Sequence, residues 1–193
     1  MKKTLVQSFL AVLALLLAPL AHAQHQTFTV NPGASQVSFF LAGSDHGVHG
    51  TFHVQSGMVD FDRNPARISG SIVVAAGSGE TGNRSRDHKM LTEVLNASQF
   101  SEVTFQPQSY QGTVLSSGDS SIQVSGIFTL HGTPHNITVP MQIHIEGGSL
   151  TARTHFRVPY VQWGLKNPSI LFLKVAKEVD VDLALTGTLI PAN

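Results

Sequence analysis

Apolar and polar residues alternate along much of this chain, and residues 122–146 show the pattern most clearly. Val124, Phe128 and Leu130 fall on one face, with polar residues between them. After a short segment that contains Gly and Pro, the alternation restarts and continues to residue 145. A period of two on both sides of a turn is typical of an antiparallel hairpin with one buried face. A helix here would be interrupted by Pro134 and Pro140.

The same alternation recurs along the rest of the chain. It predicts strands over residues 28–30, 37–41, 52–61, 68–74, 103–110, 113–115, 122–131, 136–146, 150–158, 170–175 and 179–185. Only residues 87–95 have helical features: Asp87 is a suitable N-cap, and the apolar residues after it share one helical face. Counted together, these segments amount to roughly eight or nine strands, so the pattern predicts an all-β domain of about eight antiparallel strands with one short helix.

Many short antiparallel strands favour closure into a barrel, because a closed sheet has no unpaired edge. A barrel of about eight strands either holds one small ligand or is filled by its own side chains. A sandwich of two sheets is the alternative architecture. The alternation predicts which residues face inward, but it does not distinguish a filled barrel from a hollow one.

The first 23 residues have the features of a secretory signal peptide. Lys2 and Lys3 precede an apolar run, and Ala21 and Ala23 offer small residues for cleavage before Gln24. A membrane anchor is the alternative, but the apolar run is shorter than the ~20 residues that a spanning helix needs. We therefore expect residues 24–193 to form one exported, periplasmic domain with no membrane span after cleavage.

Composition limits the possible functions of that domain. The chain has no cysteine, which excludes disulfides, thiolate metal sites and a lipid anchor on cysteine. Residues 1–23 hold two lysines and no acid, so ten of the twelve basic residues and all twelve acidic residues remain in the exported part. No basic run is present, which argues against nucleic acid as a partner and against electrostatic membrane binding.

Several short motifs resemble those of the YceI-like family, whose members are periplasmic, lipocalin-like proteins that bind polyisoprenoids. In chain order the motifs are Asn31-Pro32 followed by Val37 and Phe39, Val48 to Phe52, Ser56 to Asp62, Thr81-Gly82-Asn83 followed by Arg86-Asp87, Phe105, and Gly126 to Gly132 followed by Pro140. The resemblance implies an extended barrel whose apolar interior holds a long isoprenoid or another amphiphile. Residues 158–169 depart from the general pattern of the family, and Lys89 stands where relatives have a histidine.

The inward phase of the alternating strands supplies the candidate ligand-binding residues. We expect the barrel interior to be lined by Phe39, Leu41, Ile72, Val74, Phe128, Leu130, Ile143 and Phe156. Tyr160 and Trp163 are expected to meet the polar head of the ligand near the mouth, because amphipathic aromatic side chains suit such a boundary.

Histidines suggest a second kind of site. His46 and His49 lie in or near one predicted loop, and His131 and His135 lie near another. If both regions meet at one end of the barrel, their imidazoles have the chemistry to bind zinc, copper or nickel. The competing interpretation is that they are polar loop residues.

No sequence pattern indicates catalysis: there is no Gly-x-Ser-x-Gly, no His-Glu-x-x-His and no phosphate-binding loop. The leading hypothesis is a non-enzymatic protein that binds, sequesters or transports a lipid and requires no cofactor. The alternative is a histidine-rich metal-binding or redox-associated protein, and a hydrolase ranks third. A homodimer is compatible with either of the first two.

Overall fold

The computed structural model describes residues 25–169 and 174–191. The expected signal peptide and most of the strand expected at 170–175 lie outside the described residues. Within them, the strands are β1 (His25–Val30), β2 (Gln36–Leu41), β3 (Val48–Phe52), β4 (Val54–Arg63), β5 (Ala66–Ala75), β6 (Glu102–Gln111), β7 (Gly118–Leu130), β8 (Thr133–Glu146), β9 (Ser149–Val158) and β10 (Val179–Pro191). The helical elements are η1 (Pro32–Ala34), η2 (Ala76–Ser78), α1 (Arg84–Lys89) and η3 (Met90–Val94).

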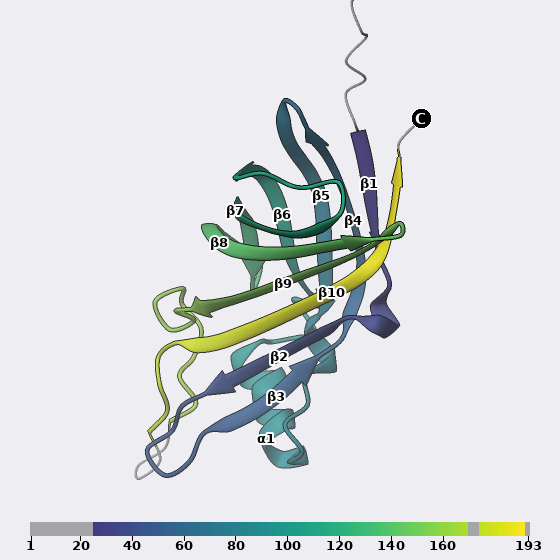
Figure 1. The fold of residues 1–193 in the computed structure, drawn as a ribbon. Helices are drawn as coiled ribbons and strands as arrows, with labels where there is room; N and C mark the ends of the chain where they lie inside the picture. The colour runs from purple at the N-terminus through teal and green to yellow at the C-terminus, as the bar shows by residue number, and fades with distance from the viewer. Residues whose placement is uncertain (1–24, 170–173, 192–193) are drawn as a thin grey trace, which may run out of the picture.

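The sheet closes on itself, which confirms the predicted antiparallel barrel (Figure 1). Eight strands complete the circuit in the order β1-β4-β5-β6-β7-β8-β9-β10, and β10 pairs back to β1 through Phe28 with Leu189 and Val30 with Gly187. Closure leaves no free edge between the first and last strands and rules out the sandwich. Strands β2 and β3 extend the wall: β2 pairs with the first half of β10, and β3 pairs with β2.

Alternation sets the inward face of each strand, but the two ends of the interior differ. At the end that holds the β4–β5 hairpin, large side chains meet and fill the lumen. Phe28, Phe61 and Tyr110 are buried there, and the Tyr110 hydroxyl donates a hydrogen bond to the Asp62 carbonyl at 2.7 Å. The barrel is therefore filled by its own side chains at this end only.

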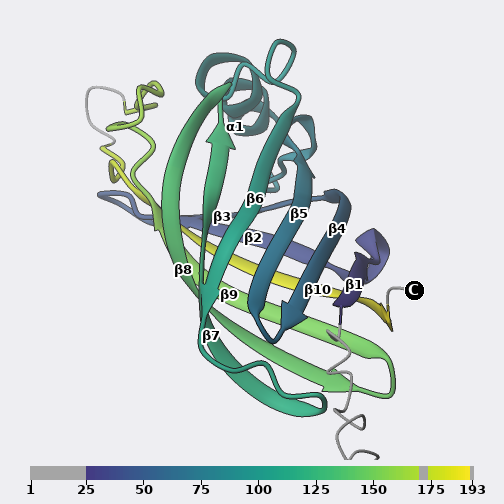
Figure 2. The same cartoon turned by 90° about the horizontal axis from the view of Figure 1, so that it is seen from above.

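The opposite end carries the helical segment between β5 and β6, as the view in Figure 2 shows. Helix α1 starts three residues earlier than the sequence predicts, because Asn83 is its N-cap and accepts a hydrogen bond from the Arg86 amide at 3.1 Å. Asp87 does not cap the helix; its carboxylate accepts hydrogen bonds from the Thr81 amide and hydroxyl. A π-helical turn, η3, follows α1, so the predicted helix of residues 87–95 is two shorter elements.

The strand expected at 113–115 is also wrong. Gly112 has a φ of +113°, which turns the chain out of the ladder after β6. Val114 is then buried in the core from a loop, so its apolar side chain gives a strand-like signal without strand pairing. Among residues 25–169 and 174–191, no helix has the length and apolar character to cross a bilayer.

Candidate functional site

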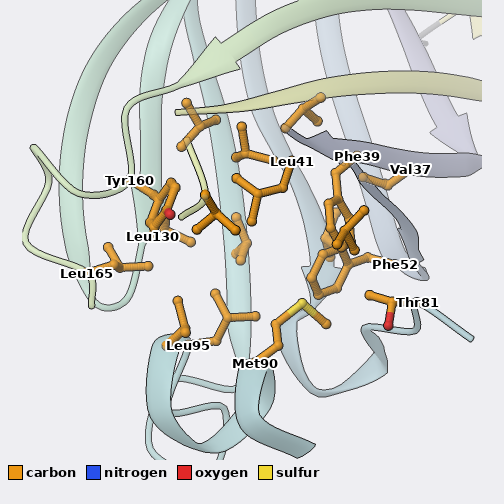
Figure 3. Close-up of a pocket in the computed structure, with 18 of the residues that line it drawn as sticks. Val37, Phe39, Leu41, Phe52, Thr81, Met90, Leu95, Leu130, Tyr160 and Leu165 are labelled. Atoms are coloured by element: carbon orange, nitrogen blue, oxygen red, sulfur yellow. The ribbon is translucent and has the colours of Figure 1, made fainter. Parts of the chain in front are cut away.

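A cavity of about 680 Å³ occupies the end of the barrel beneath the helical segment (Figure 3). Its walls are the inward faces of β2, β3, β5, β6, β7, β8, β9 and β10, and η3 covers it. The apolar wall residues include Val37, Phe39, Leu41, Phe52, Ile72, Val74, Val103, Phe105, Phe128, Leu130, Ile137, Val139, Met141, Phe156, Val158, Val181 and Leu183. Its size falls within the range of small-molecule pockets.

Aromatic side chains stand on two sides of this cavity. Phe39 and Phe52 have ring centroids 5.4 Å apart, and Phe128 meets Phe156 edge to face at 5.9 Å. Phe52, Phe128 and Phe156 are only partly buried although they point inward, because part of each ring faces open space. Apolar surface left open in this way is a favourable surface for an apolar ligand.

Polar groups inside the wall are few. The Tyr160 hydroxyl donates to the Ala176 carbonyl at 2.7 Å, and burial raises the pKa of this phenol, so it stays neutral. Thr154 is 8% exposed, and its hydroxyl oxygen has no hydrogen-bond partner in the described part of the chain. The interior can therefore bind a ligand by removing apolar surface from water, and it offers few groups for hydrogen bonds.

Two polar rims form the mouth of the cavity. One is the β2–β3 loop, which is tied to the segment before β10: the Ser44 amide donates to the Lys174 carbonyl at 2.8 Å, and the Ala176 amide donates to the Ala42 carbonyl at 2.8 Å. The other rim is α1 and the residues before it. Its lining side chains include Arg86 and Lys89.

Arg86 orders its own rim. Its Nε donates to the Thr81 hydroxyl oxygen and its Nη2 donates to the Thr81 carbonyl, both at 2.8 Å. Thr81 in turn donates to Asp87, so one chain of hydrogen bonds joins the loop before α1 to the helix. The predicted Thr81-Gly82-Asn83 and Arg86-Asp87 motif is therefore a structural device that shapes the mouth.

Eight of the ten predicted ligand-binding residues line the cavity: Phe39, Leu41, Ile72, Val74, Phe128, Leu130, Phe156 and Tyr160. Ile143 does not, although it has the inward phase of β8. It pairs with Ser120 and Ala152 and packs against the buried cluster, so it lies toward the end of the barrel that side chains fill. Whether the eight bind a ligand remains a prediction.

Trp163 also lies outside the lining set. Its ring stacks on His135 at 3.9 Å with an interplanar angle of 7°, and its centroid is 5.8 Å from that of Phe128. The loop after β9 thus places this aromatic against the β7–β8 hairpin instead of at the mouth. Strand periodicity could not predict this, because the loop has none.

The residues that sequence reasoning missed are further inward-facing strand residues, such as Val139 and Leu183, and the residues of the helical cover. Met90, Val94 and Leu95 line the cavity, and Leu165 reaches it from the loop after β9. The sequence showed that Met90, Val94 and Leu95 share an apolar helical face, but it did not show that this face covers the cavity. Figure 3 shows Met90 and Leu95 on one side of the cavity, opposite Leu41 and Phe39.

The four candidate metal-binding histidines are not brought together. His46 contacts the carboxylate of its neighbour Asp45 at 2.8 Å, and His49 packs on Phe40 with ring centroids 4.6 Å apart. His131 packs on Phe100 and His135 on Trp163, so each histidine has a separate local partner. In the described ranges, no group of three or more His, Asp or Glu residues is placed to hold a metal ion.

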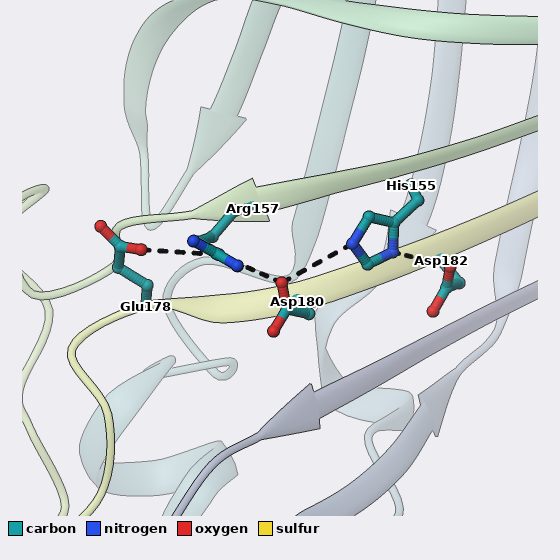
Figure 4. Close-up of polar contacts among 5 residues, drawn as sticks. All are labelled: His155, Arg157, Glu178, Asp180 and Asp182. Carbon is teal, nitrogen blue, oxygen red and sulfur yellow. Dashed lines mark hydrogen bonds and ion pairs between the residues drawn. The ribbon is translucent and has the colours of Figure 1, made fainter.

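A second polar cluster lies on the outer face of β9 and β10 (Figure 4). Cross-strand neighbours pair there: His155 contacts Asp182 at 2.9 Å, and Arg157 donates to Asp180 at 3.1 Å. The hydrogen bond to Asp180, followed by the charges of Asp180 and Glu178, raises the pKa of Arg157. These groups are largely exposed, so they mark the solvent face of the barrel and stabilise it little.

An ion pair fastens the cover to the barrel. Lys166 Nζ, in the loop after β9, donates to Glu93 Oε2 in η3 at 2.5 Å. This hydrogen bond, together with the lysine charge, holds the pKa of the Glu93 carboxyl below its usual range. The pair therefore supports the cover above the ordinary pKa of a glutamate, and the support is lost as pH falls through the lowered pKa of Glu93.

We expect Glu93→Gln to loosen the cover. At neutral pH the amide of Leu95, which donates to the Met90 carbonyl at 2.9 Å, should exchange with solvent roughly twofold to fivefold faster than in the parent protein, as befits one exposed pair. The difference should shrink in acid, where the parent also lacks the pair. Hydrogen-exchange mass spectrometry measures this, with Glu146→Gln at the far end of the barrel as control. Equal exchange in both proteins at neutral pH would contradict the expectation.

Comparison with known proteins gives concordant matches. A family model described as the YceI-like domain matches residues 28–187. Similar solved structures are BcnA of Burkholderia cenocepacia (TM-score 0.67, 21% identity, 82% of this chain and 99% of that chain covered), a polyisoprenoid binding domain from Saccharophagus degradans (0.63, 15%, 83% and 97%) and the Campylobacter jejuni YceI protein (0.58, 15%, 73% and 84%). None of the curated proteins matches the chain. At these identities the structural likeness establishes the fold.

Proposed function

Since the chain belongs to the YceI-like family, we propose that this protein is a non-enzymatic carrier that holds a polyisoprenoid or a similar amphiphilic lipid inside its barrel. The observation that carries the proposal is the half-filled lumen: side chains pack one end, and an apolar cavity of about 680 Å³ remains at the other. The Saccharophagus degradans neighbour is described as a polyisoprenoid binding domain, which supports the same class of ligand.

The cavity walls suit a hydrocarbon chain. Transfer of apolar surface out of water contributes about 25 cal/mol per Å² and requires no directional bond. One liquid water takes up about 30 Å³, and a methylene group is of similar size, so the cavity has room for roughly 20 such groups, or about four isoprene units. The polar rims would then lie beside the head of the lipid.

We also propose that the protein works outside the cytoplasm. The support is the basic start, apolar run and small-residue cleavage site within residues 1–23. Purification from the periplasm of an expressing bacterium should yield a chain that begins at Gln24, which the intact mass of the purified protein measures directly.

Leu130→Trp is expected to expel the lipid while the barrel stays folded. Leu130 is buried in the cavity wall, and the larger indole would occupy the space of the ligand. Native mass spectrometry and organic extraction of the purified protein should show a co-purified lipid in the parent. The variant should retain less than about a tenth of it, which is the loss expected when apolar contact with the tail is removed.

Leu115→Trp is the matched control, because Leu115 is 48% exposed and lies outside the cavity. It should retain the parent's lipid. If Leu130→Trp fails to fold, Leu41→Trp fills the same cavity from a half-buried position. Equal lipid in the parent and in a folded cavity variant would overturn the assignment of the lumen as the binding site.

A further inference from the structure

We propose that the mouth of the cavity selects lipids with an acidic head group, and that Lys89, Lys174 and Arg86 recognise its oxyanion. The inference rests on the proposed function and deepens it. The cavity would bind the tail of the lipid, and the residues at the mouth would recognise its head group. A phosphate and a carboxylate share this chemistry; phosphate carries more charge and serves as the probe below.

The charges at the mouth are unbalanced. The charged residues that line the cavity are three cations, Arg86, Lys89 and Lys174, and one acid, Asp45. The Asp45 carboxylate contacts the His46 ring at 2.8 Å. Acidic residues outnumber basic ones after residue 23, so a local excess of cations at this one opening is not a consequence of overall composition.

The two acids of the neighbouring helical segment, Asp87 and Glu93, are already engaged. The Asp87 carboxylate accepts hydrogen bonds from the amide and hydroxyl of Thr81, and Glu93 accepts from Lys166; neither acid lines the cavity. Within the described residues, the side chains of Lys89 and Lys174 form no ion pair or hydrogen bond. The Lys89 charge also attracts the Glu93 carboxylate, which is bonded to Lys166, whereas the Lys174 ammonium has no such partner among the described residues. Neither ammonium group is held by a direct bond, so both can approach a ligand.

Arg86 is held in place for the same purpose. Two of its five N–H donors bond to Thr81, which fixes the guanidinium at the rim and leaves the others for an oxyanion. Lys89 lies on the same rim in α1, whereas Lys174 lies on the opposite rim, in the segment joined to the β2–β3 loop. A head group leaving the apolar cavity would therefore pass between cations from both sides.

Two lipids with the same tail but different head groups distinguish the contribution of the head to affinity from that of the tail. Geranylgeraniol and geranylgeranyl phosphate both carry four isoprene units, and their dissociation constants can be measured by competition for a fluorescent fatty ligand. We expect the phosphate to bind about tenfold more tightly than the alcohol at low ionic strength, since three solvent-accessible cations each contribute modestly. This preference should fall as salt is added, and binding of the alcohol should not.

Lys89→Met and Lys174→Met remove one charge each and keep an apolar stem of similar length. Each should lower the preference for the phosphate about twofold, and the double variant should lower it about fivefold, which leaves the roughly twofold share of Arg86. Arg67→Met is the matched control: Arg67 is exposed on β5 beside the β4–β5 hairpin at the filled end, so the preference should be unchanged. Arg86 is not substituted, because its bonds to Thr81 also order the rim.

The remaining outcomes distinguish failure of head-group recognition from failure of lipid binding. Equal affinity for the two probes, or a preference that neither lysine variant lowers, would overturn the inference while tail binding stands. Failure of both probes to bind would instead count against the proposed lipid binding. Inorganic phosphate at millimolar concentration should neither bind measurably nor displace geranylgeraniol; tight binding of the free ion would identify a phosphate site unrelated to a lipid head and would also overturn the inference.

Discussion

Phe128→Asp is expected to abolish lipid uptake and to lower the free energy of unfolding by about 3 kcal/mol or more. The ring of Phe128 forms part of the cavity wall and meets Phe156 edge to face at 5.9 Å. A carboxylate at this position would face apolar side chains without a cation, so both the lost contacts and the buried charge oppose folding. Urea denaturation followed by fluorescence, with lipid extraction in parallel, measures the two effects.

The pH dependence of that variant adds a second check. Burial would raise the pKa of the introduced carboxyl above that of the unfolded chain, so the folded state would bind the proton more readily. The variant should therefore recover stability as pH falls through this raised pKa. Thr129→Asp places the same charge at the next residue, on the outer face, and should change stability little. Equal losses in the two variants would contradict the assignment of Phe128 to the interior.

Gly187→Ala is expected to destabilise the barrel by about 3 kcal/mol, because the site has no room for a methyl group. Gly187 pairs with Val30 where β10 meets β1, at the closure of the sheet. A Cβ at this position would lie 2.0 Å from the Thr29 carbonyl oxygen and 2.9 Å from Cε2 of Phe28. Relief requires the two strands to move apart, which costs hydrogen bonds at the closure.

Gly77→Ala is the matched control for this substitution. Gly77 is exposed in η2, and a Cβ there would have no atom within 4 Å. Thermal or urea unfolding should give nearly the same stability as the parent protein for Gly77→Ala and a clear loss for Gly187→Ala. A loss below about 0.5 kcal/mol for Gly187→Ala would mean that β1 and β10 adjust at little cost, as a surface change does.

The best sequence predictions concern elements with strong local signals. The hairpin of β7 and β8 follows from alternation on both sides of a tight turn, and the turn residues His131 and Gly132 have φ values of 52° and 72°. The inward phase also identified seven lining residues. Residues outside strands were predicted less well: Trp163 joins His135, and Val114 enters the core from a loop. Such contacts depend on how loops pack, which alternation does not describe.

The histidines illustrate the same limit. His46 and His131 do lie at the same end of the barrel, as the antiparallel strand order requires, but being at one end does not place imidazoles within reach of one ion. Each histidine instead packs on the nearest aromatic or acidic group. Metal binding needs side chains to converge to within a few ångströms, and that depends on loop conformation rather than on chain order.

By itself the sequence determined which residues face inward, because a strand alternates its side chains between two faces wherever it lies. Only the tertiary structure decided which part of that interior is filled. Phe28, Phe61 and Leu189 pack into the buried cluster at the filled end, whereas Phe39 and Phe128, which have the same chemical character and the same inward phase, border open space beneath η3. The difference arises from how the closed sheet packs its side chains at one end and from where η3 covers the lumen at the other. Both are set by contacts between residues far apart in the chain, which a periodic pattern does not encode.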